Sequence, residues 1–167
     1  TRKTTWGLLD KWAVDLGGGL THRLTRNDAV MIKENDLASM EGVTDKNDQK
    51  IAELIKSLDT SQLESFIEIE VRNEKEAITA AAMWHQSHQD VDTKLVVMLD
   101  NFGPERCKGT VMQLEEMGLR NSILLEASGG ITFETLDQWF ECGVDVISTS
   151  AINRGVKPLD ISMIVGD

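Results

Sequence analysis

Charged and hydroxyl-bearing residues follow several short apolar runs of this chain, at the point where each run ends. Cations come early in the sequence and carboxylates come later, and a glycine pair and small hydroxyl residues come last. The residues concerned are Arg2, Lys3, His22, Arg23, Lys33, Glu68, Glu70, Asp100, Ser128, Gly129, Gly130, Thr149, Ser150 and Ala151. Such a set suits a polyanionic substrate whose charge is neutralised partly by Lys and Arg and partly by a divalent metal on carboxylates.

The early cations form two adjacent pairs. Arg2 and Lys3 lie at the end of the first apolar segment, and His22 and Arg23 follow the glycine turn at 17–19. Each pair alone is equally typical of a solvated strand end, because Lys and Arg are mostly exposed. Four cations beside one end of a sheet are a stronger indication of an anion site.

Lys33 and the two glutamates of the run 66–71 come from buried strands. A lysine that leaves such a strand either reaches solvent or pairs with an anion, and a Schiff-base nucleophile is the alternative. Glu68 and Glu70 alternate with apolar residues, so both carboxylates share one face of their strand. That face is either the interior of a barrel or the polar side of a half-exposed sheet.

Two loops after the later strands have phosphate-binding character. Ser128, Gly129 and Gly130 precede a predicted helix and offer free backbone N–H groups, although simple strand-to-helix geometry also requires glycine there. The hydroxyls of Thr149 and Ser150 follow the next strand. Asp100, at the end of the run 95–99, is either a metal ligand or a helix N-cap.

The elements that position these residues alternate between apolar runs and segments of helical period. Strands are predicted at 29–32, 66–71, 95–99, 122–125 and 145–148, with a sixth at 1–5, and helices at 8–16, 48–58, 74–88, 104–117 and 132–141. Glycines at 118 and 143 are expected to end helices. The pattern predicts one α/β domain over 1–167, an open or incomplete parallel β/α barrel of about six strand–helix units rather than a doubly wound sheet.

Composition excludes several classes of protein. The chain has 167 residues, 28 acidic against 17 basic, and a net charge of −11, which argues against a nucleic-acid or anionic-lipid footprint. Its apolar runs are too short to span a bilayer. Two separate cysteines, Cys107 and Cys142, indicate neither a disulfide framework nor a zinc knuckle and favour a reducing cytoplasm. Because the chain starts at Thr1, inside a predicted strand, we expect an N-terminal portion to be missing.

Eight strings carry a family resemblance: TRKTT at 1–5, GGGLTHR at 17–23, DAVMIKEND at 28–36, IEIEV at 67–71, VMLDN at 97–101, LLEASGGIT at 124–132, GVDVIS at 143–148 and KPLDIS at 157–162. In that order and spacing they resemble the C-terminal domain of the quinolinate phosphoribosyltransferases, the carboxylating nicotinate-nucleotide pyrophosphorylases. The resemblance implies an open barrel preceded by a separate domain, and a dimer or an assembly of dimers. It also implies transfer of phosphoribose from phosphoribosyl pyrophosphate to quinolinate with Mg²⁺ and loss of carbon dioxide.

The same resemblance implies roles for residues. Arg2, His22 and Arg23 would clamp the two carboxylates of quinolinate, in a pocket that Thr1 lines. Lys3 and Lys33 would lie near the substrate carboxylate and the pyrophosphate, and Glu70 and Asp100 would hold the ribose hydroxyls and Mg²⁺. The catalytic set would be Lys3, Lys33, Glu70 and Asp100. The 5′-phosphate would bind Ser128, Gly129, Gly130, Thr149, Ser150 and Ala151.

Other functions remain open from the sequence. A nicotinate phosphoribosyltransferase or a molybdenum-locus paralogue would share the scaffold and differ in the acceptor pocket. A Schiff-base aldolase would use Lys33, and a phosphate-binding barrel piece would have no turnover. His85 and His88, spaced i and i+3, are a candidate metal pair, although a polar helix end is favoured.

Overall fold

The structure is a computed structural model that describes residues 5–25, 28–40, 45–61, 65–89, 91–154 and 160–164. Its strands are β1 (Val30–Ile32), β2 (Ile67–Val71), β3 (Leu95–Asp100), β4 (Ile123–Ser128) and β5 (Val146–Ser148). Its α-helices are α1 (Gly7–Leu16), α2 (Glu34–Ala38), α3 (Asn47–Ser57), α4 (Glu74–Ser87) and α5 (Pro104–Glu116). Two 3₁₀ turns, Arg120–Ser122 and Leu136–Trp139, flank β4.

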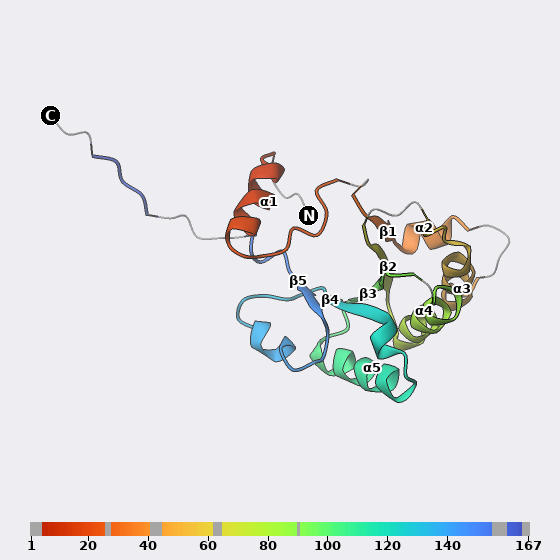
Figure 1. Cartoon of the computed structure of the whole chain (residues 1–167). Coiled ribbons are helices and arrows are strands. Elements are labelled where there is room, and N and C mark those ends of the chain that lie inside the picture. Colours follow the sequence, from red (N-terminus) through yellow and green to blue (C-terminus); the bar gives the residue numbers. More distant parts are fainter. Residues whose placement is uncertain are drawn as a thin grey trace.

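The five strands form one parallel sheet in the order β1-β2-β3-β4-β5. Strands that follow one another in sequence are also neighbours in space, as in a β/α barrel, whereas a doubly wound sheet reverses direction from its middle. Within the described residues β1 and β5 are the two edges, so the sheet is not closed (Figure 1). The predicted fold class, an open or incomplete β/α barrel, is confirmed.

The outer face of the sheet packs against helices and forms the core. Ile69, Val97 and Leu125, at the centres of three neighbouring strands, have no exposed surface. They pack with alanines of α4 and with apolar residues of α3 and α5, which lie on one side of the sheet (Figure 1). Free thiols of Cys107 and Cys142 are also buried there, and burial, with the nearby Cys142, raises the pKa of Cys107 to about 12.

Local sequence signals explain where the long helices begin. At α4 the Asn73 side chain accepts from the backbone N–H of Glu76, and the Glu76 carboxylate accepts from the N–H of Arg72. This reciprocal capping satisfies amide groups that a helix start leaves open. At α5, Pro104 occupies the first turn after Gly103, whose φ is +79°. These signals fix where α4 begins after β2 and where α5 begins after β3.

Most predicted elements are confirmed within one or two residues, but three segments of the chain need comment. The helix expected at 132–141 is wrong, because only the 3₁₀ turn Leu136–Trp139 forms there. The short α2 was not predicted, since five residues are too few to show a period. The sixth strand was placed at 1–5, of which residues 1–4 lie outside the described part. Gly118 and Gly143 have positive φ, as expected of residues that end helical turns.

Helix α1 differs from the other helices because large apolar side chains along it are exposed to solvent. Its buried residues are Gly7 and Lys11, whereas Leu8, Leu9, Trp12 and Leu16 are exposed. It lies apart from the helices that cover the sheet (Figure 1), and the Lys11 ammonium hydrogen-bonds the carbonyl of Thr21, which anchors the loop after it. No described helix combines the length and apolarity that crossing a membrane requires.

Candidate active site at the carboxyl edge of the sheet

The strand register brings the candidate residues to one edge. We call this the carboxyl edge, where β1 to β5 end at Ile32, Val71, Asp100, Ser128 and Ser148. Asp100 pairs with Ser128, and Ser128 pairs with Ser148, so these three side chains stand in one row across the sheet. One layer below, Glu70 pairs with Met98, which pairs with Glu126. The inner face of the sheet is therefore unusually acidic for a buried surface.

The loop before β1 brings His22 and Arg23 to this inner face. His22 has a φ of +59°, uncommon for a residue with a side chain. Its ring lies edge-on to Phe66, with centroids 5.2 Å apart, and its Nε2 contacts Glu68 of β2. Arg23 donates to the carbonyl of Ala29 at 3.0 Å, close to the start of β1. The sequence signal of a cation pair beside the strands is thus matched by their placement.

Lys33 and Glu70 form an ion pair at the carboxyl edge. Lys33 directly follows β1, where its backbone N–H donates to the Asp36 carboxylate at 2.8 Å and so begins α2. Its ammonium contacts Glu70, whose side chain is 13% exposed against 46% for the lysine. The pair therefore lies where the inner face opens to solvent at the carboxyl edge. A charged group of a substrate can there replace either partner of the ion pair.

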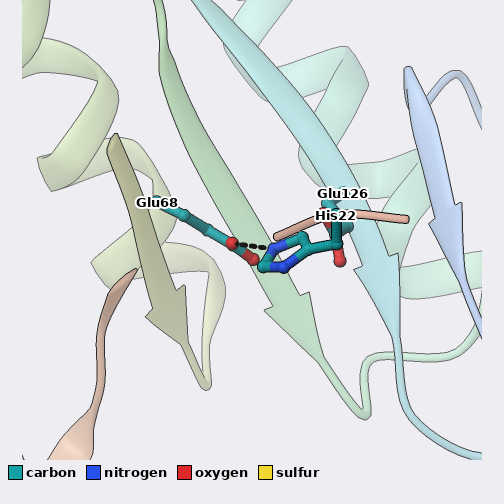
Figure 2. A group of neighbouring side chains, drawn as sticks. All are labelled: His22, Glu68 and Glu126. Carbon is teal, nitrogen blue, oxygen red and sulfur yellow. Dashed lines mark hydrogen bonds and ion pairs between the residues drawn. The ribbon is translucent and has the colours of Figure 1, made fainter. Parts of the chain in front are cut away.

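Below this pair, three titratable side chains converge (Figure 2). Ligand atoms of His22, Glu68 and Glu126 all lie within 4.8 Å of one another. Glu68 and Glu126 are 1% and 3% exposed, and one oxygen of each has no hydrogen-bond partner among the described residues. Burial, and then the charge of Glu68, raise the pKa of Glu126. The burial of Glu68 excludes the half-exposed strand that its sequence position left open.

The loops after β3 and β4 interlock. Asn101, at a φ of +58°, donates from its backbone N–H to the carbonyl of Ser128 at 2.8 Å, and its side chain donates to Asp100 at 2.9 Å. A Cβ on Gly129 would lie 2.2 Å from Asn101 Oδ1. The glycine at 129 is therefore required by a close approach and by its own φ of +97°.

The glycine loop and the loop after β5 also contact each other. Thr149 donates from its hydroxyl to the carbonyl of Ile131 at 2.6 Å and accepts from the N–H of Ala151 at 3.0 Å. In the part of the chain that the structure describes, the N–H groups of Gly129 and Gly130 are paired with no backbone carbonyl. The two predicted phosphate loops are thus adjacent, with donors available.

A pocket of about 310 Å³ borders the glycine loop. It lies between the loops that follow β3 and β4, at the start of α5. Its lining residues are Asn101, Phe102, Gly103, Pro104, Gly129, Gly130, Thr135, Gln138 and Trp139. The pocket borders the predicted phosphate loop without reaching the loop at 149–151.

Three predicted site residues, Thr1, Arg2 and Lys3, lie outside the described residues. His85 and His88 do not form a metal pair, because His85 hydrogen-bonds Ser122 at 2.8 Å and the His88 ring stacks on Trp84. Within the described residues the one cluster of three metal-ligand side chains is that of His22, Glu68 and Glu126.

Sequence reasoning missed Glu126 and Asn101. Glu126 interrupts an apolar strand two residues before Ser128, so the period of two already placed it on the inner face with Ser128. For Asn101 the available signal was Asn directly after a strand, a residue type that tolerates positive φ. Both were hidden by more conspicuous neighbours, Ser128 and Asp100.

The donor set at the carboxyl edge fits Mg²⁺. Glu70 pairs with Met98, two residues before Asp100, so the two carboxylates project from neighbouring strands in diagonal positions. Magnesium in phosphate-transfer sites is usually held by one or two carboxylates together with substrate phosphates and water. Glu70 and Asp100 can supply that carboxylate pair once Lys33 exchanges its partner.

Comparison with known proteins gives consistent results. A family model described as "Quinolinate phosphoribosyl transferase, C-terminal domain" matches residues 1–164. The chain is 35% identical over 165 residues to the probable carboxylating nicotinate-nucleotide pyrophosphorylase of Methanothermobacter thermautotrophicus, covering 98% of this chain and 53% of that protein. It is 34% identical over 169 residues to the decarboxylating quinolinate phosphoribosyltransferase 1b of Nicotiana tabacum, covering 98% and 46%.

Among solved structures, the nicotinate-nucleotide pyrophosphorylase of Francisella tularensis matches with a TM-score of 0.68 and 34% identity, covering 94% of this chain and 49% of that one. The chain thus spans about half the length of the relatives it matches. Because the family model extends over nearly every residue and the fold agrees, the chain belongs to the quinolinate phosphoribosyltransferase family, of which it carries the C-terminal domain.

Proposed function

We propose that the protein transfers phosphoribose from phosphoribosyl pyrophosphate to quinolinate, with decarboxylation, and so forms nicotinate mononucleotide, pyrophosphate and carbon dioxide. The observation that carries the proposal is the placement of Lys33, Glu70 and Asp100 at the carboxyl edge beside the glycine loop. His22 and Arg23 lie deeper on the same inner face of the sheet, near the starts of β1 and β2. The names of the relatives support the reaction, and the acidic surroundings of the edge explain why its cations are needed.

In this proposal the early cations recognise the acceptor. Arg23 and His22 stand beside β1 and β2, and Arg2, outside the described residues, joins them by the family resemblance. Guanidinium groups bind carboxylates through two parallel N–H donors, which orients a planar dicarboxylate as well as neutralising it. Thr1 and Lys3 complete the pocket.

The later loops bind the donor. Ser128, Gly129 and Gly130, together with Thr149, Ser150 and Ala151, present backbone and hydroxyl donors to the 5′-phosphate. The N–H groups of the two glycines, which donate to no backbone carbonyl within the described residues, support this role, since backbone concavities of this kind bind anions. Glu70 and Asp100 accept hydrogen bonds from the ribose hydroxyls.

Glu70 and Asp100 would also hold Mg²⁺, which would supply positive charge to neutralise the leaving pyrophosphate. Lys33 releases Glu70 and turns to the same pyrophosphate oxygens. The carboxylates that remain beside the ribose stabilise its carbon as positive charge develops there. The quinolinate nitrogen then bonds that carbon as the pyrophosphate leaves. The cationic ring loses its 2-carboxylate as carbon dioxide, the bonding pair stays on ring carbon 2, and that carbon takes up a proton from water.

Two further features are proposed with the reaction. We expect a dimer or an assembly of dimers, for which the exposed apolar residues of α1 are an available surface. We also expect a cytoplasmic location, in keeping with two buried free thiols. Sedimentation of the protein and imaging of a tagged copy would test these expectations separately from catalysis.

The test uses the protein as its gene encodes it, with phosphoribosyl pyrophosphate and Mg²⁺ in excess. Nicotinate mononucleotide is measured by chromatography with quinolinate as acceptor and, in a parallel reaction, with nicotinate. We expect product with quinolinate and little or none with nicotinate. Product with nicotinate alone would assign the same scaffold to a different acceptor and contradict the proposal.

A further inference from the structure

The imidazole of His22 is held by two residues that lie next to each other in the fold. Its Nε2 contacts the carboxylate of Glu68, and its ring edge packs on Phe66, one residue before β2. Both contacts come from β2 and the residue directly before it, whereas His22 itself belongs to a loop. The ring orientation is therefore set by β2.

The backbone of His22 indicates that this arrangement is enforced. A φ of +59° is strained for a residue with a Cβ, and such conformations persist where the surroundings determine them. The loop beyond His22 is closed by Asp28, whose carboxylate accepts from the N–H groups of Leu24 and Thr25 at 2.8 and 2.7 Å. Loop and strand together fix one position of the ring.

Glu68 has few alternatives to His22. It is 1% exposed, its second oxygen has no partner among the described residues, and the buried Glu126, another carboxylate, has a ligand atom within 4.8 Å of one of its own. A buried carboxylate deprived of its partner is strongly destabilising. The Glu68–His22 contact is thus the one that satisfies this carboxylate.

We propose that Glu68 is the positioning residue of His22: it accepts a hydrogen bond from Nε2 and thereby presents the rest of the imidazole to the acceptor substrate. A carboxylate only accepts hydrogen bonds, so the contact places a hydrogen on Nε2 and fixes how the ring is turned. This inference rests on the proposed function, in which His22 contacts quinolinate. It assigns Glu68 a role that Lys33, Glu70 and Asp100 do not share.

Steady-state kinetics of the full protein test this role. Glu68→Leu replaces the carboxylate beside Val96 with an apolar side chain and so removes the hydrogen-bond acceptor of His22. Glu68→Gln retains one acceptor oxygen. We expect Glu68→Leu to raise KM for quinolinate by about 10- to 100-fold, the range that small misplacements of an aligned group produce. KM for phosphoribosyl pyrophosphate should stay within about twofold, and Glu68→Gln should restore most of the loss.

A double-mutant cycle with His22→Ala separates positioning from general damage. If Glu68 acts through the ring, Glu68→Leu adds nothing to the quinolinate KM once His22 is absent. The double variant should also regain part of the unfolding free energy that His22→Ala loses by leaving Glu68 unpaired. Glu76→Gln, which alters a buried carboxylate on the helix side of the sheet, is the matched control and should change neither KM.

Nitrogen NMR of the three histidines gives a readout that does not depend on activity. The wild-type protein should show a hydrogen on His22 Nε2, and Glu68→Leu should lose this preference. A wild-type Nε2 without hydrogen would overturn the proposal. So would stoichiometric metal in the purified protein that disappears in Glu68→Leu, since Nε2 would then be a metal ligand.

The kinetic outcomes distinguish the two proposals. A wild-type protein with no quinolinate turnover contradicts the proposed function. An active wild-type protein whose Glu68→Leu variant keeps its quinolinate KM, raises both KM values equally, or acts additively with His22→Ala contradicts the role of Glu68 alone.

Discussion

Gly129 lies so close to Asn101 that a methyl group added at 129 would lie 2.2 Å from Asn101 Oδ1 and 2.9 Å from its backbone nitrogen. The contact joins the loop that follows β3 to the loop that follows β4. It also places Asp100, the neighbour of Asn101, beside the glycine loop. Asp100, the predicted metal ligand, and the predicted phosphate loop at 128–130 therefore form one structural unit, which this contact holds together.

The first prediction concerns this unit. Gly129→Ala should lower stability by about 1–3 kcal/mol and raise KM for phosphoribosyl pyrophosphate, because Asn101 must move. Gly130→Ala is the matched variant: its φ is also positive, at +69°, but no atom lies within 4 Å of the added methyl. It should cost only the backbone strain. Equal effects of the two variants, in chemical unfolding and in kinetics, would show that the Asn101 contact has no importance.

The second prediction concerns the buried Glu126. Because burial raises its pKa above the usual 4.5, the folded protein holds a proton there that the unfolded chain has released. The free energy of unfolding should thus fall as pH rises from about 4.5 through the raised value. Glu126→Gln should remove this part of the fall and be more stable than wild type at the upper end. Unfolding curves measured across that pH range would contradict us if both proteins changed in parallel.

The third prediction concerns Asp145, at the start of β5. Its carboxylate accepts from the buried amide of Leu125 at 2.7 Å and from Arg120 at 2.8 Å. Asp145→Ala should lower the free energy of unfolding by about 1–3 kcal/mol, the cost of a buried donor without a partner. Asp145→Asn keeps an acceptor for Leu125 and should lose less. If both variants unfold at the wild-type denaturant concentration, the side chain does not secure the edge strand.

The fourth prediction concerns the acceptor clamp. Arg23→Ala should weaken quinolinate binding about 10- to 100-fold, since charge-assisted hydrogen bonds contribute about 1.5–3 kcal/mol. Binding of phosphoribosyl pyrophosphate should change much less. Calorimetric titration of both ligands checks this, with Lys75→Ala, an exposed cation paired with Asp48 on the helix side, as control. Equal losses for the two ligands would count against the clamp.

The fifth prediction concerns Asp100. Loss of an outer-shell partner of a metal ligand typically costs about 10- to 100-fold in activity. Asp100→Asn changes a proposed ligand itself, so it should reduce Mg²⁺-dependent turnover by at least that factor. The fold should be unchanged, because the side-chain hydrogen bond that Asp100 makes within the described residues is a local one, accepted from its neighbour Asn101. Asp92→Asn, at an exposed position three residues before β3 begins, is the matched control. Unchanged activity of Asp100→Asn over a range of Mg²⁺ concentrations would remove the metal role.

The sequence predicted the sheet well because the central strand β3 is buried on both faces and reads as a continuous apolar run, and the alternating apolar residues of β2 have the period of a strand. It also placed Lys33, Glu70 and Asp100 at strand ends, where parallel sheets gather their functional residues. The helix expected at 132–141 is wrong, because Leu136 and Trp139 reach the core from a 3₁₀ turn while Phe133 and Phe140 stay exposed. The contacts of His22 with Phe66 and Glu68 span more than 40 positions of sequence, and no local pattern encodes such a pair.

One measurement tests the central claim most directly: the ratio of carbon dioxide to pyrophosphate released when the protein as encoded turns over quinolinate labelled in its 2-carboxylate, with phosphoribosyl pyrophosphate and Mg²⁺. We predict equal amounts of the two products, and neither when Arg23 is replaced by Ala at low quinolinate. Pyrophosphate released without labelled carbon dioxide, or equally well without quinolinate, would contradict the account.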